Sequence, residues 1–202
     1  MQSIERKILS RIHRHGRGWC FTPKSFVDLG SSQAVRIALF RLAEAGTVRR
    51  LARGLYDYPR RHAHVGLVAP RPEAVAKALA ERDATRLQSS GAYAANSLGL
   101  TDQVPAKVVF LTDGPSRHVK VGALDIILKR TTPRNMKMAG KVSGTLFQAL
   151  RHIGPAAVEQ QHIDHLKAQL SDRDKQTVAH DRRYAPRWMQ PVIDAIVGGN
   201  HA

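Results

Sequence analysis

Residues 31–59, SSQAVRIALFRLAEAGTVRRLARGLYDYP, join a helical pattern to a short basic segment, and this junction decides how the first third of the chain folds. Ser31 or Ser32 is a favourable N-cap, and apolar residues recur at helical spacing until Gly46, which suits a helix end. Beyond that glycine, two short apolar runs flank Gly54, where the chain can reverse its direction. The stretch therefore predicts a helix followed by a two-stranded hairpin.

Two further helices are predicted upstream of this stretch. The first begins after Ser3 and ends near residues 16–18, because isoleucine and leucine recur there at helical spacing between charged residues. The second is short: Thr22 is expected to cap it, Pro23 to begin it and Gly30 to end it. A tight glycine turn then leads into the helix of the quoted stretch.

The order of these elements indicates an N-terminal winged helix-turn-helix domain, which we place at residues 1–60. A segment rich in proline, arginine and histidine, without clear periodicity, predicts a linker at residues 61–72. Residues 73–202 combine helical patterns with short strands, which indicates a C-terminal mixed α/β domain with a small sheet and several helices. The predicted fold class of the whole chain is therefore α+β.

Elements of the C-terminal domain follow from local patterns. Residues 72–88 predict a strong amphipathic helix, and SSGAYAANSLGL predicts a short one. KVVFLTDG indicates a buried strand that ends in a turn, and VKVGALDIILKRT indicates one bent strand or two. The tail is predicted as helices over residues 143–154, 154–170 and 186–198, with residues 172–184 as a charged connection.

Basic residues dominate the charge of the chain and are concentrated near its beginning. The 202 residues include 32 Lys and Arg against 16 Asp and Glu, a net charge of +16. Residues 1–62 hold 13 basic and 4 acidic residues, net +9, whereas residues 63–202 hold 19 and 12, net +7. A field of this sign favours polyanions, so nucleic acid is the expected partner.

The remaining composition is that of an ordinary globular protein, with 43% hydrophobic and 24% charged residues. No apolar run is long enough for a membrane helix, and the first residues lack the apolar core of a signal peptide. The single cysteine, Cys20, excludes an internal disulfide and fits a reducing compartment. We therefore expect a cytoplasmic protein that does not contact membranes.

Eight polar and basic residues are predicted to contact DNA. A helix that follows a tight turn suits the major groove, where Gln33 can pair with an adenine edge and Arg36 with a guanine edge. The serines at the helix start and the hairpin arginines are expected to touch phosphates or reach into the minor groove. The predicted DNA-binding residues are Ser31, Ser32, Gln33, Arg36, Arg41, Arg49, Arg50 and Arg53.

Catalytic, metal and cofactor sites are not predicted. Asp113 and Asp125 flank the sheet, but Asp113 precedes Gly-Pro and is explained by turn chemistry. His162 and His165 are three residues apart without the glutamate of a zinc-protease helix, and no phosphate-binding glycine loop or nucleophile elbow occurs. We therefore expect a protein that is not an enzyme and that carries no metal or cofactor.

Two longer stretches identify a family resemblance. RLAEAGTVRRLARGLYDYP, followed by PEAVAKALAERDATRLQSSGAYAANSLGLTDQVPAKVVFLTDGPSR, resembles the AbiEi-type antitoxins of type IV bacterial toxin–antitoxin operons. The resemblance spans about residues 4–155, is most diagnostic over residues 91–117 and weakens in the tail.

The resemblance implies a repressor of its own operon, which binds inverted-repeat operator DNA with two copies. It also implies that the C-terminal domain counters a nucleotidyltransferase-like toxin through a basic face. Lys107 is a candidate for this face, and the partner-surface residues are Arg86, Arg117, Lys120, Lys129, Arg130, Arg134, Lys137 and Lys141.

Other functions remain open at the level of sequence. Winged helices also serve as protein-docking modules, although the clustered arginines favour DNA. The chain is alternatively a stand-alone regulator that senses a small molecule in its C-terminal domain, or a nucleic-acid-processing enzyme that uses Asp113 or Asp125 with a metal ion.

Overall fold

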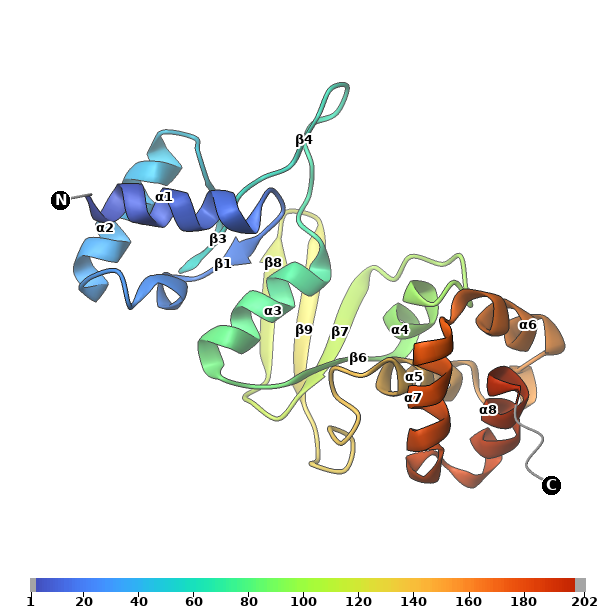
Figure 1. Cartoon of the computed structure of the whole chain (residues 1–202). Helices are drawn as coiled ribbons and strands as arrows, with labels where there is room; N and C mark the ends of the chain where they lie inside the picture. Colours follow the sequence, from blue (N-terminus) through green and yellow to red (C-terminus); the bar gives the residue numbers. More distant parts are fainter. Residues whose placement is uncertain (1–2, 199–202) are drawn as a thin grey trace. The chain divides into compact units, whose positions relative to one another are not determined.

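The computed structural model describes residues 3–198, and its contacts divide this part of the chain into two compact units (Figure 1). The N-terminal unit comprises the residues up to 85 together with 118–126, and the C-terminal unit comprises 86–117 together with the residues from 127 on. Helices alternate with small sheets, so the mixed α/β character that the sequence predicts is present.

Helices and short strands alternate from the start of the N-terminal unit. The elements up to residue 85 are α1 (Ile4–His15), β1 (Cys20–Phe21), η1 (Pro23–Phe26), α2 (Ser32–Glu44), β2 (Arg49–Ala52), β3 (Leu55–Asp57), β4 (Arg61–His62), β5 (Gly66–Leu67) and α3 (Pro72–Asp83).

The two helices α1 and α2 begin at the predicted caps. The Ser3 side chain accepts a hydrogen bond from the Arg6 amide at 3.3 Å, and the Ser31 side chain accepts one from the Ala34 amide at 3.2 Å. Each bond satisfies one amide that the first helical turn leaves without a partner. Serine capping thus fixes where both helices begin.

One core joins these helices to the first sheet. Its members are buried residues of α1, η1, α2 and the strands, and they include Ile8, Ile12, Phe21, Phe26, Val35, Ala38, Leu39 and Leu42. Trp19 packs against it, with ring centroids 4.7 Å from Phe21 and 5.8 Å from Phe26. The apolar stripe predicted for residues 31–46 is therefore the face that α2 buries.

The segment between α1 and α2 differs from its prediction. It forms the 3-10 helix η1, in which the Thr22 amide donates to the Ser25 side chain at 3.3 Å, and not an α-helix. Gly30 does not adopt the left-handed conformation of a helix cap. A Cβ at this position would instead lie 2.6 Å from Ile4 Cδ1, so a larger residue would displace that side chain at the start of α1.

The three-stranded sheet has the antiparallel order β1-β3-β2. Strands β2 and β3 form the hairpin predicted around Gly54, whose φ of 70° provides the left-handed backbone that the turn requires. Arg50 pairs with Tyr56, and the register shifts between Arg50 and Ala52. The predicted basic hairpin is thus present, with a bulge in its first strand.

The predicted linker contains structure of its own. Strands β4 and β5 pair as a second small hairpin, whose residues are exposed and which protrudes from the rest of its unit (Figure 1). The compact units also divide elsewhere than the predicted boundaries at residues 60 and 73. Helix α3 belongs to the N-terminal unit, because it packs on β1 and buries Val75, Ala76 and Leu79.

The C-terminal unit contains helices, strands and part of the hairpin at residues 117–130, because the boundary between the two units passes through that hairpin. The elements after residue 85 are β6 (Leu87–Ser89), α4 (Gly91–Ser97), β7 (Lys107–Thr112), β8 (Arg117–Val121), β9 (Leu124–Arg130), α5 (Val142–Ile153), η2 (Pro155–Ala157), α6 (Gln160–Gln169), α7 (Asp172–Asp181), η3 (Arg182–Tyr184), η4 (Arg187–Met189) and α8 (Gln190–Val197). The second sheet has the strand order β6-β7-β9-β8.

Three predictions for residues 72–184 are corrected or decided. The helix expected over residues 72–88 stops at Asp83, because Ala84 adopts a left-handed conformation with φ of 54°, and strand β6 follows. VKVGALDIILKRT forms two strands. The charged connection expected at residues 172–184 is mostly the helix α7, which Ser171 caps by accepting from the Asp174 amide at 3.2 Å.

A second core lies among the helices of the C-terminal unit. Its buried members come from α4, α5, α6, α7 and α8, and they include Leu146, Leu150, Leu166, Val178, Met189 and Ile193. Trp188 packs against this core. Within residues 3–198, none of the helices has the length and apolar character that a membrane crossing requires.

Candidate nucleic-acid interface

Helix α2 presents a polar and basic face opposite the face that it buries. Gln33, Arg36 and Arg41 are exposed there, and Ile37 and Phe40 between them are 45% and 57% exposed. Among residues 3–198, the side chains of the two arginines take part in no ion pair or side-chain hydrogen bond. The side chains of this face are therefore available to a ligand.

The predicted serine contacts lie at the start of the same helix. Ser31 and Ser32 are both exposed, and Ser31 uses its side-chain oxygen as the cap acceptor described above. The free amides of a first helical turn also favour anions, because they carry the positive end of the helix dipole.

The three hairpin arginines have different environments. Arg50 and Arg53 are exposed and, within the described residues, make no ion pair. Arg49 donates from Nε to Asp57 Oδ1 at 3.1 Å and from Nη2 to Asp57 Oδ2 at 2.7 Å, and also to the Val68 carbonyl at 3.0 Å. The guanidinium of Arg49, whose side chain is 27% exposed, is thus engaged by Asp57 and Val68, and the proposal below does not use it as a DNA contact.

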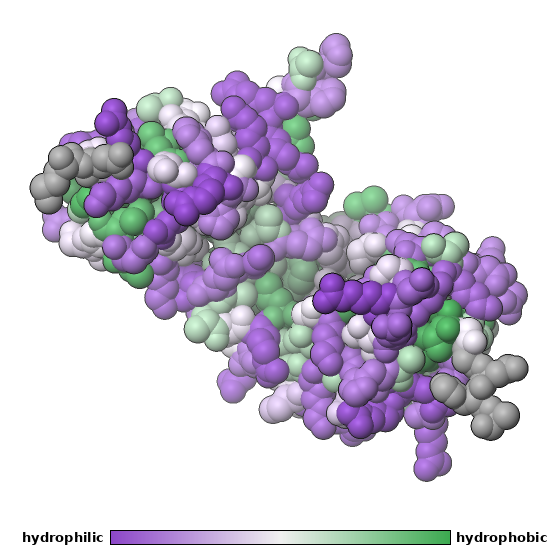
Figure 2. Space-filling view, viewed as in Figure 1, coloured by the Kyte–Doolittle hydropathy of each residue, from purple (hydrophilic) through white to green (hydrophobic). Residues whose placement is uncertain are grey.

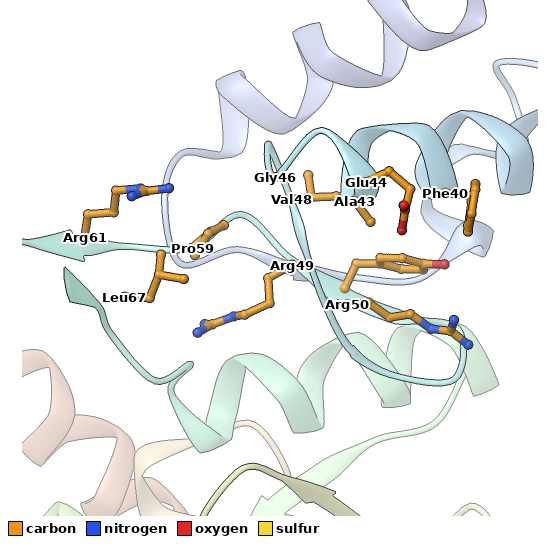
Figure 3. Close-up of a pocket in the computed structure, with 11 residues that line it drawn as sticks. Phe40, Ala43, Glu44, Gly46, Val48, Arg49, Arg50, Pro59, Arg61 and Leu67 are labelled. Carbon is orange, nitrogen blue, oxygen red and sulfur yellow. The ribbon is translucent and has the colours of Figure 1, made fainter.

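A groove of about 370 Å³ lies between α2, the β2–β3 hairpin and the β4–β5 hairpin. In Figure 3, Phe40, Glu44 and Arg50 lie at one end of this groove, and Arg61 and Leu67 lie at the other. Arg61 is exposed and lies in the segment that the sequence assigned to a linker. In the sequence, the adjacent pair Arg60 and Arg61 is the signal for a basic residue at this groove. The proline-rich surroundings favoured a linker instead.

Figure 2 shows hydrophilic residues over most of the visible face of the N-terminal unit and over the β4–β5 hairpin. The apolar residues between them are scattered and do not form one broad surface there. Polar surroundings of this kind suit a wet, charged interface more than a dry protein–protein contact.

The eight predicted partner-surface residues of the second half are all exposed. Among them, Arg86 donates from Nε to Asp113 at 2.8 Å, and Lys141 Nζ lies 3.1 Å from Asp181. Because the Arg86 amide and side chain both donate to Asp113, the pKa of that carboxyl lies below its ordinary value. Each of these two ion pairs joins segments that are distant in the sequence, so both residues have a structural role.

The acid and imidazole groups considered for catalysis are dispersed. Asp113 is engaged with Arg86, and Asp125 contacts the His118 ring. His165 contacts the Leu98 carbonyl at 3.1 Å, and His162 accepts from the Glu159 amide at 3.1 Å. In the part of the chain that the structure describes, no three His, Cys, Asp or Glu side chains group as metal ligands.

Cys20 is expected to be inert in the folded protein. It is 2% exposed, and burial, followed by the nearby Asp57 charge, raises the pKa of its thiol to about 12. At pH 8, the thiolate fraction is then about a thousandfold lower than for a free cysteine with a pKa of about 8.5. Reaction with a disulfide reagent such as DTNB should be slower by at least about this factor in buffer than in 6 M guanidinium. Equal rates in both solvents would show that the thiol is accessible.

The chain resembles a known protein family and a solved structure. The model of a family described as a family of unknown function, DUF6088, matches residues 7–178. The comparison with curated proteins gave no match. Among solved structures, the chain is similar to the crystal structure of the RV2827C protein from Mycobacterium tuberculosis, with 14% sequence identity and a TM-score of 0.48. That match covers 100% of this chain and 83% of the other.

Proposed function

The chain belongs to the DUF6088 family, whose function is unknown, and we propose that it binds double-stranded DNA through a winged helix and represses its own operon. One observation carries the proposal: α2 buries an apolar face while Gln33, Arg36 and Arg41 stay exposed on the other. Two exposed arginines of the adjoining hairpin extend the basic surface.

In this proposal α1, η1 and α2 form the helical part of the winged helix, and the β2–β3 hairpin is the wing. Helix α2 is the recognition helix and enters the major groove with its N-terminal half. The wing lies beside the phosphate backbone, where Arg50 and Arg53 neutralise charge. Ile37 and Phe40 suit contacts with thymine methyl groups, which are the apolar feature of that groove.

The direct test is binding to the DNA upstream of the gene. Fluorescence anisotropy with a labelled duplex of that region is compared with a duplex of the same composition in scrambled order. We expect tighter binding to the upstream duplex, and affinity for both should fall steeply between 50 and 200 mM salt because bound counterions are released. No preference for the upstream duplex at any salt concentration would refute the repressor proposal.

Substitutions should separate base reading from phosphate binding. Gln33→Ala and Arg36→Ala are each expected to cost about 1–3 kcal/mol on the operator and little on random DNA, because base contacts carry the discrimination. Arg50→Ala and Arg53→Ala should weaken binding to both duplexes and lower the salt slope by about one each. Anisotropy titrations of all four variants on both duplexes measure this. Equal losses on both duplexes for all four variants would contradict the assigned roles.

We also propose that the second half of the chain counters a nucleotidyltransferase-like toxin. The resemblance to AbiEi-type antitoxins supports this role, together with the exposure of all eight predicted cations. The test is growth: expression of a neighbouring nucleotidyltransferase-like reading frame should arrest cells, and co-expression of this chain should restore growth. A chain that carries Arg50→Ala and Arg53→Ala should still restore growth, since those residues belong to the wing.

A further inference from the structure

A basic hollow lies within the C-terminal unit, apart from the proposed recognition helix and wing. Its volume is about 450 Å³, within the range of small-ligand sites. The loop after β9, one face of α5 and the turn after α7 form its walls. The lining residues that the argument uses are Arg134, Lys137, Gly144, Arg151, Arg183 and Tyr184.

Four of the lining side chains are cationic, and none of the lining residues is acidic. Arg134, Lys137, Arg151 and Arg183 are all exposed, and in the described chain none of them makes an ion pair with a carboxylate. Four like charges around one hollow repel each other, so a bound anion would relieve an unfavourable arrangement.

Two carboxylates, on α7 and α8, are already engaged by other groups. Asp181 is fully buried; it accepts from Ser143 at 2.5 Å and is paired with Lys141 at 3.1 Å. Asp194 is paired with Arg182, whose Nε and Nη2 lie 2.5 and 2.7 Å from its two oxygens. Neither of these two carboxylates is therefore free to compensate the positive charge of the hollow.

An aromatic ring stands beside the cations. Tyr184 is 43% exposed, although large aromatic residues usually bury most of their surface. Lys137 Nζ lies 5.4 Å from the centre of this ring, and Arg183 Cζ lies 5.0 Å from it. An exposed ring that is in contact with two cations suits a ligand that has both a flat base and a negative charge, because bases stack on aromatic side chains.

The walls of the hollow are held in place. Met136 and Met138 of the loop are buried, at 0% and 8% exposure. Gly144 of α5 allows the loop to approach, since a Cβ there would lie 2.3 Å from the Met138 carbonyl oxygen. The Lys141–Asp181 pair connects the loop to α7. A preformed hollow binds without a large cost of ordering, which favours a specific ligand.

We infer that this hollow binds a phosphorylated nucleoside, with the arginines and Lys137 on the phosphates and Tyr184 stacked on the base. Arginine forks match phosphate oxygens in pairs, and three of the four cations are arginines. The ligand chemistry has two possible sources, a free nucleotide or the phosphorylated end of a single strand. The inference goes beyond the two roles proposed above and depends on neither.

The test uses the full chain and four probes: ATP, inorganic triphosphate, adenosine and a 5′-phosphorylated single-stranded decamer. Isothermal titration calorimetry in low salt with EDTA should show one saturable site for ATP or for the decamer, and none for adenosine. Arg151→Ala and Arg183→Ala should each weaken the bound probe about tenfold, the loss expected for one charge-assisted contact. Tyr184→Ala should weaken ATP severalfold and leave inorganic triphosphate within about twofold.

Matched controls separate the hollow from the general charge of the chain. Arg173 on α7 and Lys167 on α6 are exposed and do not line the hollow, so alanine at either position should leave binding within twofold. Tighter binding of ATP than of the decamer identifies a free nucleotide, and the reverse order identifies a strand end. The inference is overturned if neither probe saturates, or if the control variants lose as much affinity as Arg183→Ala. Thermal melting of each variant verifies its folding.

Discussion

Replacing Arg49 by alanine is expected to destabilise the folded protein by about 3–5 kcal/mol, because it leaves a buried carboxylate without its partner. Asp57 is 1% exposed, and both of its side-chain oxygens accept from the Arg49 guanidinium. The same guanidinium satisfies the Val68 carbonyl at 3.0 Å. Its loss therefore leaves a charged group and a carbonyl without the hydrogen-bond donor that they share. Urea unfolding followed by circular dichroism measures the change in the free energy of unfolding.

The neighbouring arginine provides the control for this prediction. Arg50 is exposed and unpaired within residues 3–198, so Arg50→Ala should change stability by no more than about 0.5 kcal/mol. Asp57→Asn added to Arg49→Ala removes the buried charge and should recover part of the loss. Equal stabilities of the two single variants would contradict the structural role of Arg49. The pair also separates folding from binding, since Arg50→Ala should weaken DNA binding while the protein remains stable.

Replacing Gly144 by alanine is the second change with a large expected effect. A Cβ there would lie 2.1 Å from Gln88 Oε1 and 2.3 Å from the Met138 carbonyl oxygen, and Gln88 is 3% exposed. Neither atom can move without disturbing buried neighbours, so we expect a loss of about 3 kcal/mol from overpacking. Alanine is favoured over glycine inside a helix by about 1 kcal/mol, which offsets only a part. The midpoint of urea unfolding should fall accordingly.

A glycine in open space distinguishes steric clash from backbone strain. Gly46 has a φ of 69°, and a Cβ there would meet nothing within 4 Å. Gly46→Ala should therefore cost only about 1 kcal/mol, through the left-handed backbone alone. A smaller loss for Gly144→Ala than for Gly46→Ala would show that α5 and the loop before it are not packed as the structure describes.

The N-terminal helices and the basic hairpin were predictable because their signals are local. Ser3 and Ser31 cap helices with their own side chains, and Gly54 turns the hairpin between adjacent strands. Each of these features depends on residues within a few positions, which is the range over which sequence patterns act. The exposed polar face of α2 followed from the same periodicity.

The errors arose where packing with distant residues decides the structure. Strand β6 exists because it pairs with β7, Leu87 opposite Thr112, and no local signal reports that partner. Helix α7 buries few of its residues and has a charged sequence, so its pattern resembled a connection. Arg49 is indistinguishable from Arg50 in the sequence. Only the register that places it opposite Asp57 shows that its charge is engaged.

The same long-range dependence explains the basic hollow of the C-terminal unit. Arg134, Arg151 and Arg183 come from a loop, a helix and a turn that are up to 49 residues apart in the chain. No local pattern connects these three residues. They line one hollow because the Lys141–Asp181 pair and the buried methionines hold the loop beside α5 and α7.

The chain has two tryptophans, and the two cores described above contain one each at their margins: Trp19 beside Phe21 and Phe26, and Trp188 beside the helical core. Each compact unit therefore carries its own intrinsic fluorophore. A chain with Trp188→Phe emits from the N-terminal unit alone, and one with Trp19→Phe emits from the other. Stopped-flow emission of the two single-tryptophan chains thus follows the collapse of each core separately, without an external label.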